Sequence, residues 1–283
     1  MHKKKAFSLI ASSCALLILA APGATSAQPL ERWTLSVGGS AQNYGYREVS
    51  DSGHLLNKET GGLPGVALSL GYAFDQWQIV GDLHHHRGDV TYEGKTNNGI
   101  PITTRTNQSL SRVSMRAEYW PITVTAVNYA LYFGAGLHDQ VRDIQPTRAS
   151  SGAPVSGLFE TYQWWLGFLG AKMVMHQSDR VNWQIDARLT STVKPTVTID
   201  FNGRFDTTRL ELGERWGVRL ELPWKYSLSP NTQIMVVPFA EKHTLGRSST
   251  TALTSRGIPT GAIYEPRSES RNFGFQIGVS QRF

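Results

Sequence analysis

The sequence predicts an all-β fold, a closed antiparallel transmembrane β-barrel of about ten strands with five long extracellular loops. About ten segments alternate apolar with small or polar side chains, which is the period of a strand with one face in lipid. The links between these segments alternate between short and long, as expected when one end of a barrel carries tight turns. After residue 27, no apolar run is long enough for a membrane-spanning helix, so strands are the spanning elements.

The first five predicted strands share this alternation. The first, 33–41, begins with Trp33, Leu35 and Val37 on one face. Asp75-Gln76 and Pro121 supply tight turns between later strands. The same period-two pattern predicts strands over 66–74, 77–83, 113–119 and 127–137.

The second five follow the same rule with one ambiguity. Segment 162–175 is apolar on both faces, so its phase is not predicted. Strands are then predicted over 181–189, 216–222 and 232–243. The last strand places Phe273, Phe275, Ile277 and Val279 on one face and ends at Phe283.

Five longer links each connect an odd-numbered predicted strand to the strand that follows it. They are rich in Gly, Ser, Thr, Asn and charged residues, and an even strand count leaves both termini on the side of the short turns. The predicted extracellular loops are 47–62, 87–108, 139–159, 191–208 and 244–268.

The N-terminal 27 residues predict export. Lys3, Lys4 and Lys5 precede an apolar run over 6–21, and Thr25-Ser26-Ala27 offers a cleavage site. We therefore expect a signal peptide over 1–27 and a barrel domain over 28–283. Loss of the three lysines lowers the net charge from +6 to +3, so charge gives no reason to expect a nucleic-acid partner.

Cys14 is the only cysteine and lies inside the predicted signal peptide, so no disulfide is expected. At the other end, the terminal aromatic Phe283 resembles the signal by which outer-membrane barrels are recognised and inserted. That resemblance implies the cell outer membrane as the location. The implied partners are the barrel assembly machinery, outer-membrane lipid and lipopolysaccharide.

Charged side chains alternate with the apolar ones and are expected to face the lumen. Buried charges must pair, so the set predicts an ion-paired plug, with a narrow porin-like channel as the alternative. The residues concerned are Arg112, Arg116, Glu118, Asp186, Arg188, Arg209, Glu211, Arg215, Arg219 and Glu221.

Two carboxylate–histidine pairs are candidates for catalysis. Asp82 and His84 share the inward face of the third strand, near its outer end, and Glu241 and His243 share a face of the ninth. Structural roles for both pairs are the simpler interpretation. Strand alternation keeps the three consecutive histidines, 84–86, from converging on one metal ion, and no metal or cofactor is expected.

Omptin-type outer-membrane proteases, also ten-stranded barrels, pair an Asp-x-Asp with an Asp-x-His on the opposite wall. This chain has Asp82-Leu83-His84 at the first position, and its link 191–208 holds Asp200 and Asp206 but no histidine. The opposed constellation is missing, so protease activity is not transferred. For a lipid-modifying hydrolase, His85 would face lipid, but no serine partner is identified by spacing.

From the fourth strand onward, the chain resembles the Opc-type family of ten-stranded outer-membrane adhesins. The resemblance is carried by Phe133-Gly134-Ala135-Gly136-Leu137, Arg215-Trp216-Gly217, Pro238-Phe239, and the ending Pro266-x-Ser268-x-x-Arg271-x-Phe273-Gly274-x-x-x-Gly278. It implies a host-surface binder whose loops bind sulfated or sialylated glycans and proteoglycan-like ligands. We therefore expect an adhesin for acidic glycans or extracellular-matrix components, without catalysis.

The last loop favours the same interpretation. Its arginines suit bidentate binding of sulfate or carboxylate, and an aromatic ring suits stacking on a sugar. An ordinary solvated loop that also contacts lipopolysaccharide phosphates is the alternative. The candidate binding residues are Lys242, Arg247, Arg256, Tyr264, Arg267 and Arg271.

Overall fold

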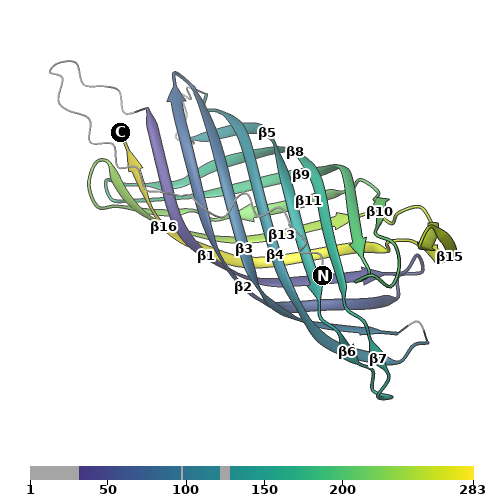
Figure 1. Ribbon diagram of the computed structural model, residues 1–283. Helices are drawn as coiled ribbons and strands as arrows, with labels where there is room; N and C mark the ends of the chain where they lie inside the picture. Colours follow the sequence, from purple (N-terminus) through teal and green to yellow (C-terminus); the bar gives the residue numbers. More distant parts are fainter. Residues whose placement is uncertain (1–31, 97, 122–127) are drawn as a thin grey trace, which may run out of the picture. The chain divides into compact units, whose positions relative to one another are not determined.

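The computed structural model describes residues 32–96, 98–121 and 128–283 (Figure 1). The barrel falls in one compact unit, Glu31–Phe283. The predicted signal peptide, 1–27, lies outside the described residues, and so does part of the turn after Pro121. Within the described ranges, no helix is both long and apolar enough to cross a membrane.

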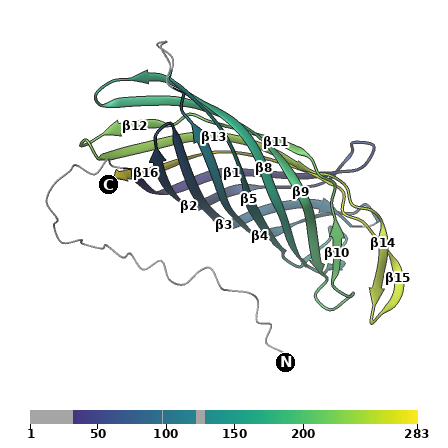
Figure 2. The same cartoon turned by 90° about the horizontal axis from the view of Figure 1, so that it is seen from above.

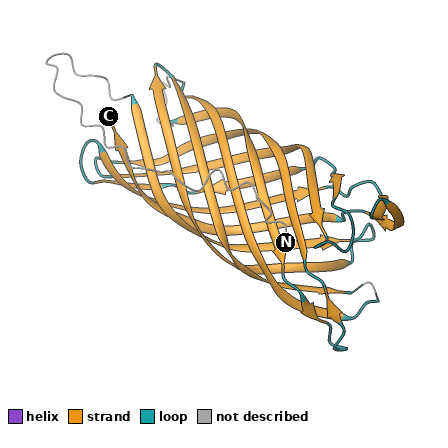
Figure 3. Ribbon diagram, in the orientation of Figure 1, coloured by secondary structure: helices purple, strands orange, loops and turns teal. Residues whose placement is uncertain are grey.

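Antiparallel strands close into a barrel, as Figure 3 shows. The ring closes where β1 pairs with β16, with Val37 opposite Val279. The predicted ten-strand closed barrel is thereby confirmed. Around the wall the strands are β1 (Trp33–Val49), β2 (Leu55–Phe74), β3 (Trp77–Lys95), β4 (Pro101–Tyr119), β5 (Tyr129–Ile144), β8 (Leu158–Gln177), β9 (Val181–Asp200), the segmented path described next, β13 (Thr232–Leu245) and β16 (Arg267–Arg282).

The eighth path around the wall consists of three short strands, all paired with β9. They are β10 (Thr208–Glu211), β11 (Trp216–Glu221) and β12 (Trp224–Ser227). Pro223 interrupts the path because it has no N–H to donate, although its carbonyl still accepts from the Gln184 N–H at 3.0 Å. At the other break, Gly213 pairs with Gly246 in an isolated bridge.

The outward face carries an apolar belt. Val113 and Met115 are 54% and 61% exposed, whereas Ser114 between them is 5% exposed, so the alternation seen in the sequence divides outside from inside. Aromatic pairs border the belt at the end that carries the short turns, which we call the turn end. Trp33 and Tyr72 lie 4.7 Å apart between ring centroids, and Trp183 and Trp224 lie 5.6 Å apart. An apolar band with an aromatic border is the surface that a barrel presents to lipid.

At the opposite end, which we call the loop end, the strands continue well past the belt. The predicted loop boundaries are therefore wrong. Much of 47–62, 87–108, 139–159 and 191–208 is strand, and only 50–54 separate β1 from β2. The outward side chains of these extensions are mostly polar, so they lack the outward apolar alternation by which the sequence reveals a strand in lipid.

Two small hairpins complete the loop end. One joins β6 (Thr147–Arg148) to β7 (Pro154–Val155), and the other joins β14 (Thr251–Ser255) to β15 (Ile258–Ile263). Figures 1 and 2 place the β14–β15 hairpin beside β10, at the same end of the barrel. The predicted last loop, 244–268, is therefore largely an ordered hairpin.

Candidate functional site

The lumen at belt level is crossed by ion pairs. Arg116 is bound to Asp82, and its Nε donates to Glu118 Oε1 at 2.6 Å. Lys172 on β8, which is separated from β4 by β5, reaches the same Glu118 oxygen. Asp82 and Glu118 are thereby matched by cations, as burial of charge requires.

A second layer lies nearer the loop end. Arg112 Nη1 lies 3.2 Å from both carboxylate oxygens of Glu241. Arg219 binds Glu241 as well and donates from Nε to Glu221 Oε1 at 2.5 Å. Charged side chains from β4, β11 and β13 thus meet across the barrel interior, as an ion-paired plug predicts.

Arg209 and Glu211 are predicted from the sequence to face the lumen, but the structure places both on the outward face of the barrel. Arg209 and Glu211 point outward because β10 pairs with β9 beyond Lys194, whose φ of 49° shifts the strand phase. Leu210 points inward instead and is 3% exposed. Arg215, also assigned to the lumen, is exposed.

The two carboxylate–histidine pairs do not form catalytic dyads in this geometry. Asp82 and His84 lie in the middle of β3, at belt level, and not near its outer end as the sequence suggested. Asp82 is held by Arg116, and His84 Nδ1 lies 3.3 Å from the amide nitrogen of Gln276. Glu241 Oε1 and His243 Nδ1 are 4.0 Å apart, beyond hydrogen-bond reach.

His243 belongs to a stacked aromatic group above the second layer. The rings of His138 and Trp164 stack with centroids 4.1 Å apart, and His243 lies 5.9 Å from His138. His86, the other inward residue of the triple histidine, lies 2.9 Å from Ser40 Oγ. Within the described residues, no group of histidines and carboxylates is arranged to hold a metal ion.

The loop end of the lumen is filled by a cluster around Arg142, which is fully buried. Its guanidinium donates to Glu160 Oε2 at 2.7 Å, Glu48 Oε1 at 3.0 Å and Glu59 Oε1 at 3.1 Å. It also stacks over the Tyr46 ring, 4.1 Å from the ring centroid. Apolar side chains of the flanking strands surround the cluster, namely Tyr44, Leu63, Val90 and Leu110 on one side and Tyr162, Trp164, Val197, Ile199, Leu210 and Leu245 on the other.

A fourth carboxyl group enters this cluster from the last loop. Glu265 accepts a hydrogen bond from the Tyr162 hydroxyl at 2.6 Å and is 5% exposed. Burial, together with the neighbouring acids, raises the pKa of Glu265 well above its ordinary value. Burial also raises the pKa of Glu160 to about 7, against the opposing effect of Arg142. Burial in this cluster therefore favours the protonated forms of Glu265 and Glu160.

The predicted binding residues fall into two groups. On the last loop, Arg247 lies over the Tyr264 ring, 4.1 Å from its centroid, and its Nε is 3.5 Å from Asp51 Oδ2. Arg256 is exposed at the tip of the β14–β15 hairpin, where its φ is 53°. We call Arg247, Arg256 and Tyr264 the hairpin group.

The hairpin is held at both its ends. At the base, Ser248 Oγ accepts from the Glu265 N–H at 2.8 Å. At the tip, Asp206 accepts from the backbone N–H groups of Arg256 at 3.0 Å and Gly257 at 2.9 Å. These backbone hydrogen bonds lower the pKa of Asp206, so it stays ionised as an anchor.

The second group lies on the outward wall, just beyond the belt. Arg271 and Lys242 are cross-strand partners on β16 and β13. Glu269 binds Arg47 at 2.6 Å and Arg267 at 3.4 Å. The hydrogen bond from Arg47 lowers the pKa of Glu269. We call Arg47, Lys242, Arg267 and Arg271 the wall cations.

Sequence reasoning missed Arg142, Glu265 and Arg47. Arg142 and Arg47 lie in segments predicted to be solvated loops, where an arginine carries no signal of burial or of a partner. A signal for Arg142 did exist, because Gln140 and Arg142 continue the alternation of β5 beyond Leu137.

Comparison with known proteins supports the fold. No family model matches the chain, and no curated protein matches its sequence. Among solved structures, the outer membrane protease OmpT of Escherichia coli is similar with a TM-score of 0.63 and 11% identity, over 92% of this chain and 99% of OmpT. At that identity the similarity establishes a shared barrel fold and no more.

Two further barrels are more distant. The outer membrane protein OprG of Pseudomonas aeruginosa matches with a TM-score of 0.38 and 12% identity, over 89% of this chain and 96% of OprG. Neisserial surface protein A matches with a TM-score of 0.32 and 11% identity, over 88% and 97% of the two chains. The similarity to OmpT and the closed antiparallel sheet show the fold of outer-membrane β-barrel proteins, and the resemblance to the Opc-type adhesins stays a prediction.

Proposed function

We propose that this protein is an outer-membrane β-barrel that binds acidic glycans or matrix components at the cell surface, without catalysis. The apolar belt supports a location in lipid, with the loop end outside the cell. The single observation that carries the binding proposal is the separation of charge in the last loop. Its acids are engaged, whereas its cations reach the surface.

Three acids and five cations lie between residues 241 and 271. Glu241 forms ion pairs in the lumen with Arg112 and Arg219. Glu265 is buried and hydrogen-bonded to Tyr162, and Glu269 forms an ion pair with Arg47. The cations are exposed or half-buried, namely Lys242, Arg247, Arg256, Arg267 and Arg271. The surface is therefore more positive than the composition indicates, which favours an anionic ligand.

The hairpin group is the part of this surface best arranged to hold a glycan. Because Asp206 and Ser248 fix the hairpin at its tip and base, binding an anionic chain costs little loop ordering. Arginine presents paired N–H donors to a sulfate or carboxylate, and the exposed Tyr264 ring offers an apolar face. The Opc-type resemblance implies the same ligand class.

The filled lumen supports binding over transport. The Arg142 cluster and the two layers of ion pairs occupy the interior, so passage of a solute would require separating buried charges. The geometry of Asp82, His84, Glu241 and His243 offers no support for the hydrolase alternative, because arginines engage the carboxylates.

We expect the folded protein to bind heparin-like polymers saturably, with an affinity that falls as salt rises. Replacing Arg247 and Arg256 together by Gln is expected to weaken binding about tenfold, since each loses a charge-assisted contact. Surface plasmon resonance on the detergent-solubilised barrel measures this.

Arg105→Gln with Arg148→Gln is the matched control, since both arginines are exposed on β4 and β6. Equal weakening by the two pairs would show only a general attraction to positive charge, and unchanged binding in the first pair would remove the proposal.

A further inference from the structure

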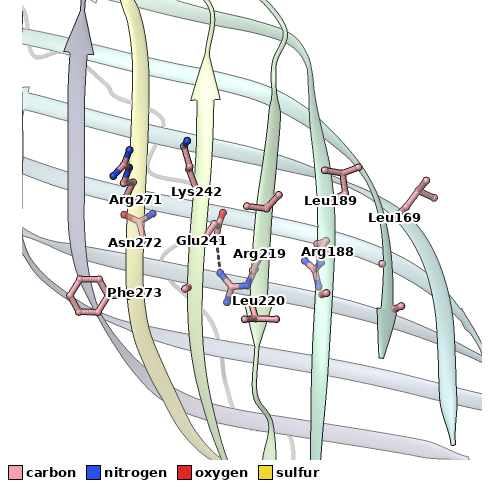
Figure 4. A pocket seen from close by; sticks show the side chains of 15 residues that line it. Leu169, Arg188, Leu189, Arg219, Leu220, Glu241, Lys242, Arg271, Asn272 and Phe273 are labelled. Atoms are coloured by element: carbon pink, nitrogen blue, oxygen red, sulfur yellow. Dashed lines mark hydrogen bonds and ion pairs between the residues drawn. The ribbon is translucent and has the colours of Figure 1, made fainter. Parts of the chain in front are cut away.

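A shallow apolar groove of about 800 Å³ crosses the outward wall of the barrel (Figure 4). Its floor follows one cross-strand row, Ala171, Ala187, Leu220, Ala240 and Phe273, taken from β8, β9, β11, β13 and β16. Three of these five residues are alanines flanked by larger apolar side chains. The groove exists because the small residues fall in register across neighbouring strands.

The neighbouring row changes from apolar to cationic along its length. It consists of Leu169, Leu189, Val218, Lys242 and Arg271 in direct register. Figure 4 shows Lys242 and Arg271 side by side at one end of the groove, with Leu189 and Leu169 toward the other. One end of the groove therefore suits an anion and the rest suits hydrocarbon.

The cationic end lies at the border of the belt. Arg271 is 62% exposed and directly precedes the outward apolar run that begins at Phe273, which is 61% exposed. Leu169 lies closer to the turn end of its strand than Arg271 does. Strands in a barrel are tilted, so a row that follows the hydrogen bonds descends from the loop-end border into the belt. Four strand spacings of about 4.8 Å give the row a length of roughly 19 Å, a span that suits an acyl chain.

The charge around this end exceeds what the protein itself neutralises. Glu269 is the acid among the wall cations and is bound by Arg47 and Arg267, with Arg271 farther away at 3.8 Å. In the described residues, no carboxylate within 4.0 Å of Lys242 Nζ is found. A ligand phosphate at this end would therefore meet two exposed cations with spare hydrogen-bond donors.

From this arrangement we propose that the groove binds a phosphorylated glycolipid of the outer leaflet, the lipid A part of lipopolysaccharide. Lys242 and Arg271 hold a phosphate, and one acyl chain lies along the alanine floor. Arg47 and Arg267 add to the local positive potential. Lys242 and Arg271 also add to the positive surface proposed for glycan binding, whereas the hairpin group takes no part in the lipid site.

The test is the amount of lipid A retained by the purified barrel in a neutral detergent, titrated and counted by native mass spectrometry. We expect one tightly held lipid A per barrel. Replacing Lys242 and Arg271 together by Gln is expected to weaken binding at least about tenfold, through loss of two charge-assisted contacts. Ala187→Trp fills the floor without changing charge and should weaken binding as well.

Ala240→Phe is a second floor-filling variant, and the change in electrophoretic mobility on heating reports whether each variant has folded. Arg247→Gln with Arg256→Gln is the control that should retain lipid A. Dephosphorylated lipid A should bind the parent weakly. It should bind the variant that lacks Lys242 and Arg271 with the same weak affinity. Unchanged binding in the folded floor-filling variants, or displacement of lipid A by phosphatidylglycerol or inorganic phosphate at equal concentration, would overturn the proposal.

Discussion

Replacing Arg142 by Leu should destabilise the loop end of the barrel by about 3–5 kcal/mol, because it leaves three buried glutamates without the guanidinium that binds them. Glu48, Glu59 and Glu160 each lose a hydrogen bond of 2.7–3.1 Å, and the pair between Tyr162 and Glu265 loses its neighbouring charge. Urea unfolding of the barrel in lipid vesicles measures the free energy. Arg209→Leu is the matched control, since the Arg209 side chain is exposed on the outward wall, and it should change stability by less than about 0.5 kcal/mol.

The loss should depend on pH in a defined direction. A carboxyl group whose pKa is raised on folding takes up a proton as the chain folds, so its contribution to stability declines as the pH rises. For Glu160 in the parent that window runs from its ordinary value of 4.5 to about 7. Because Arg142 lowers this pKa, its removal raises the pKa further, and the variant loses more stability than the parent as the pH rises. The Arg142→Leu variant should therefore be closer to the parent at pH 5 than at pH 8. A destabilisation that is the same at both pH values would contradict an electrostatic role for this arginine.

The second large effect is expected from a charge placed on the apolar belt. Val37 is 52% exposed and lies between Leu68 and Val279 on the neighbouring strands. Val37→Arg should cost about 2–4 kcal/mol in a bilayer, because the guanidinium must leave water for hydrocarbon. The same urea titration in vesicles measures it.

Asn43→Arg provides the control on the same face of the same strand, since Asn43 lies beyond the belt and is exposed. This change should cost between about 0 and 1 kcal/mol. Equal costs at the two positions would mean that the outward face of β1 does not have a lipid-covered part.

The sequence was sufficient for the barrel because lipid enforces a strict alternation. Val113, Ser114 and Met115 show how directly the pattern maps onto outside and inside. Beyond the belt that constraint ends. Val90 and Glu59 are buried in the extended strands, yet polar neighbours on both faces made these segments resemble loops.

The candidate sites depend on details that the alternation of apolar and polar residues does not reveal. Lys194, with its positive φ, shifts the phase of β9 and turns Arg209 outward. No residue type in the sequence indicates such a shift. Glu265 counted as a surface acid by sequence but is buried against Tyr162. The cations of the last loop were found by composition, whereas their division into hairpin and wall groups needed the register of β13 and β16.

Lipid contact along β2 is the most direct test of the account. Single cysteines at positions 66 to 70, in a chain with Cys14 replaced by Ala, carry a nitroxide label in vesicles. Collision with lipid-soluble oxygen should be frequent at the outward Val66, Leu68 and Leu70 and rare at Ala67 and Ser69, which face the interior. Equal accessibility at all five positions, or quenching of the outward labels by a water-soluble reagent, would contradict a closed barrel with its apolar belt in lipid.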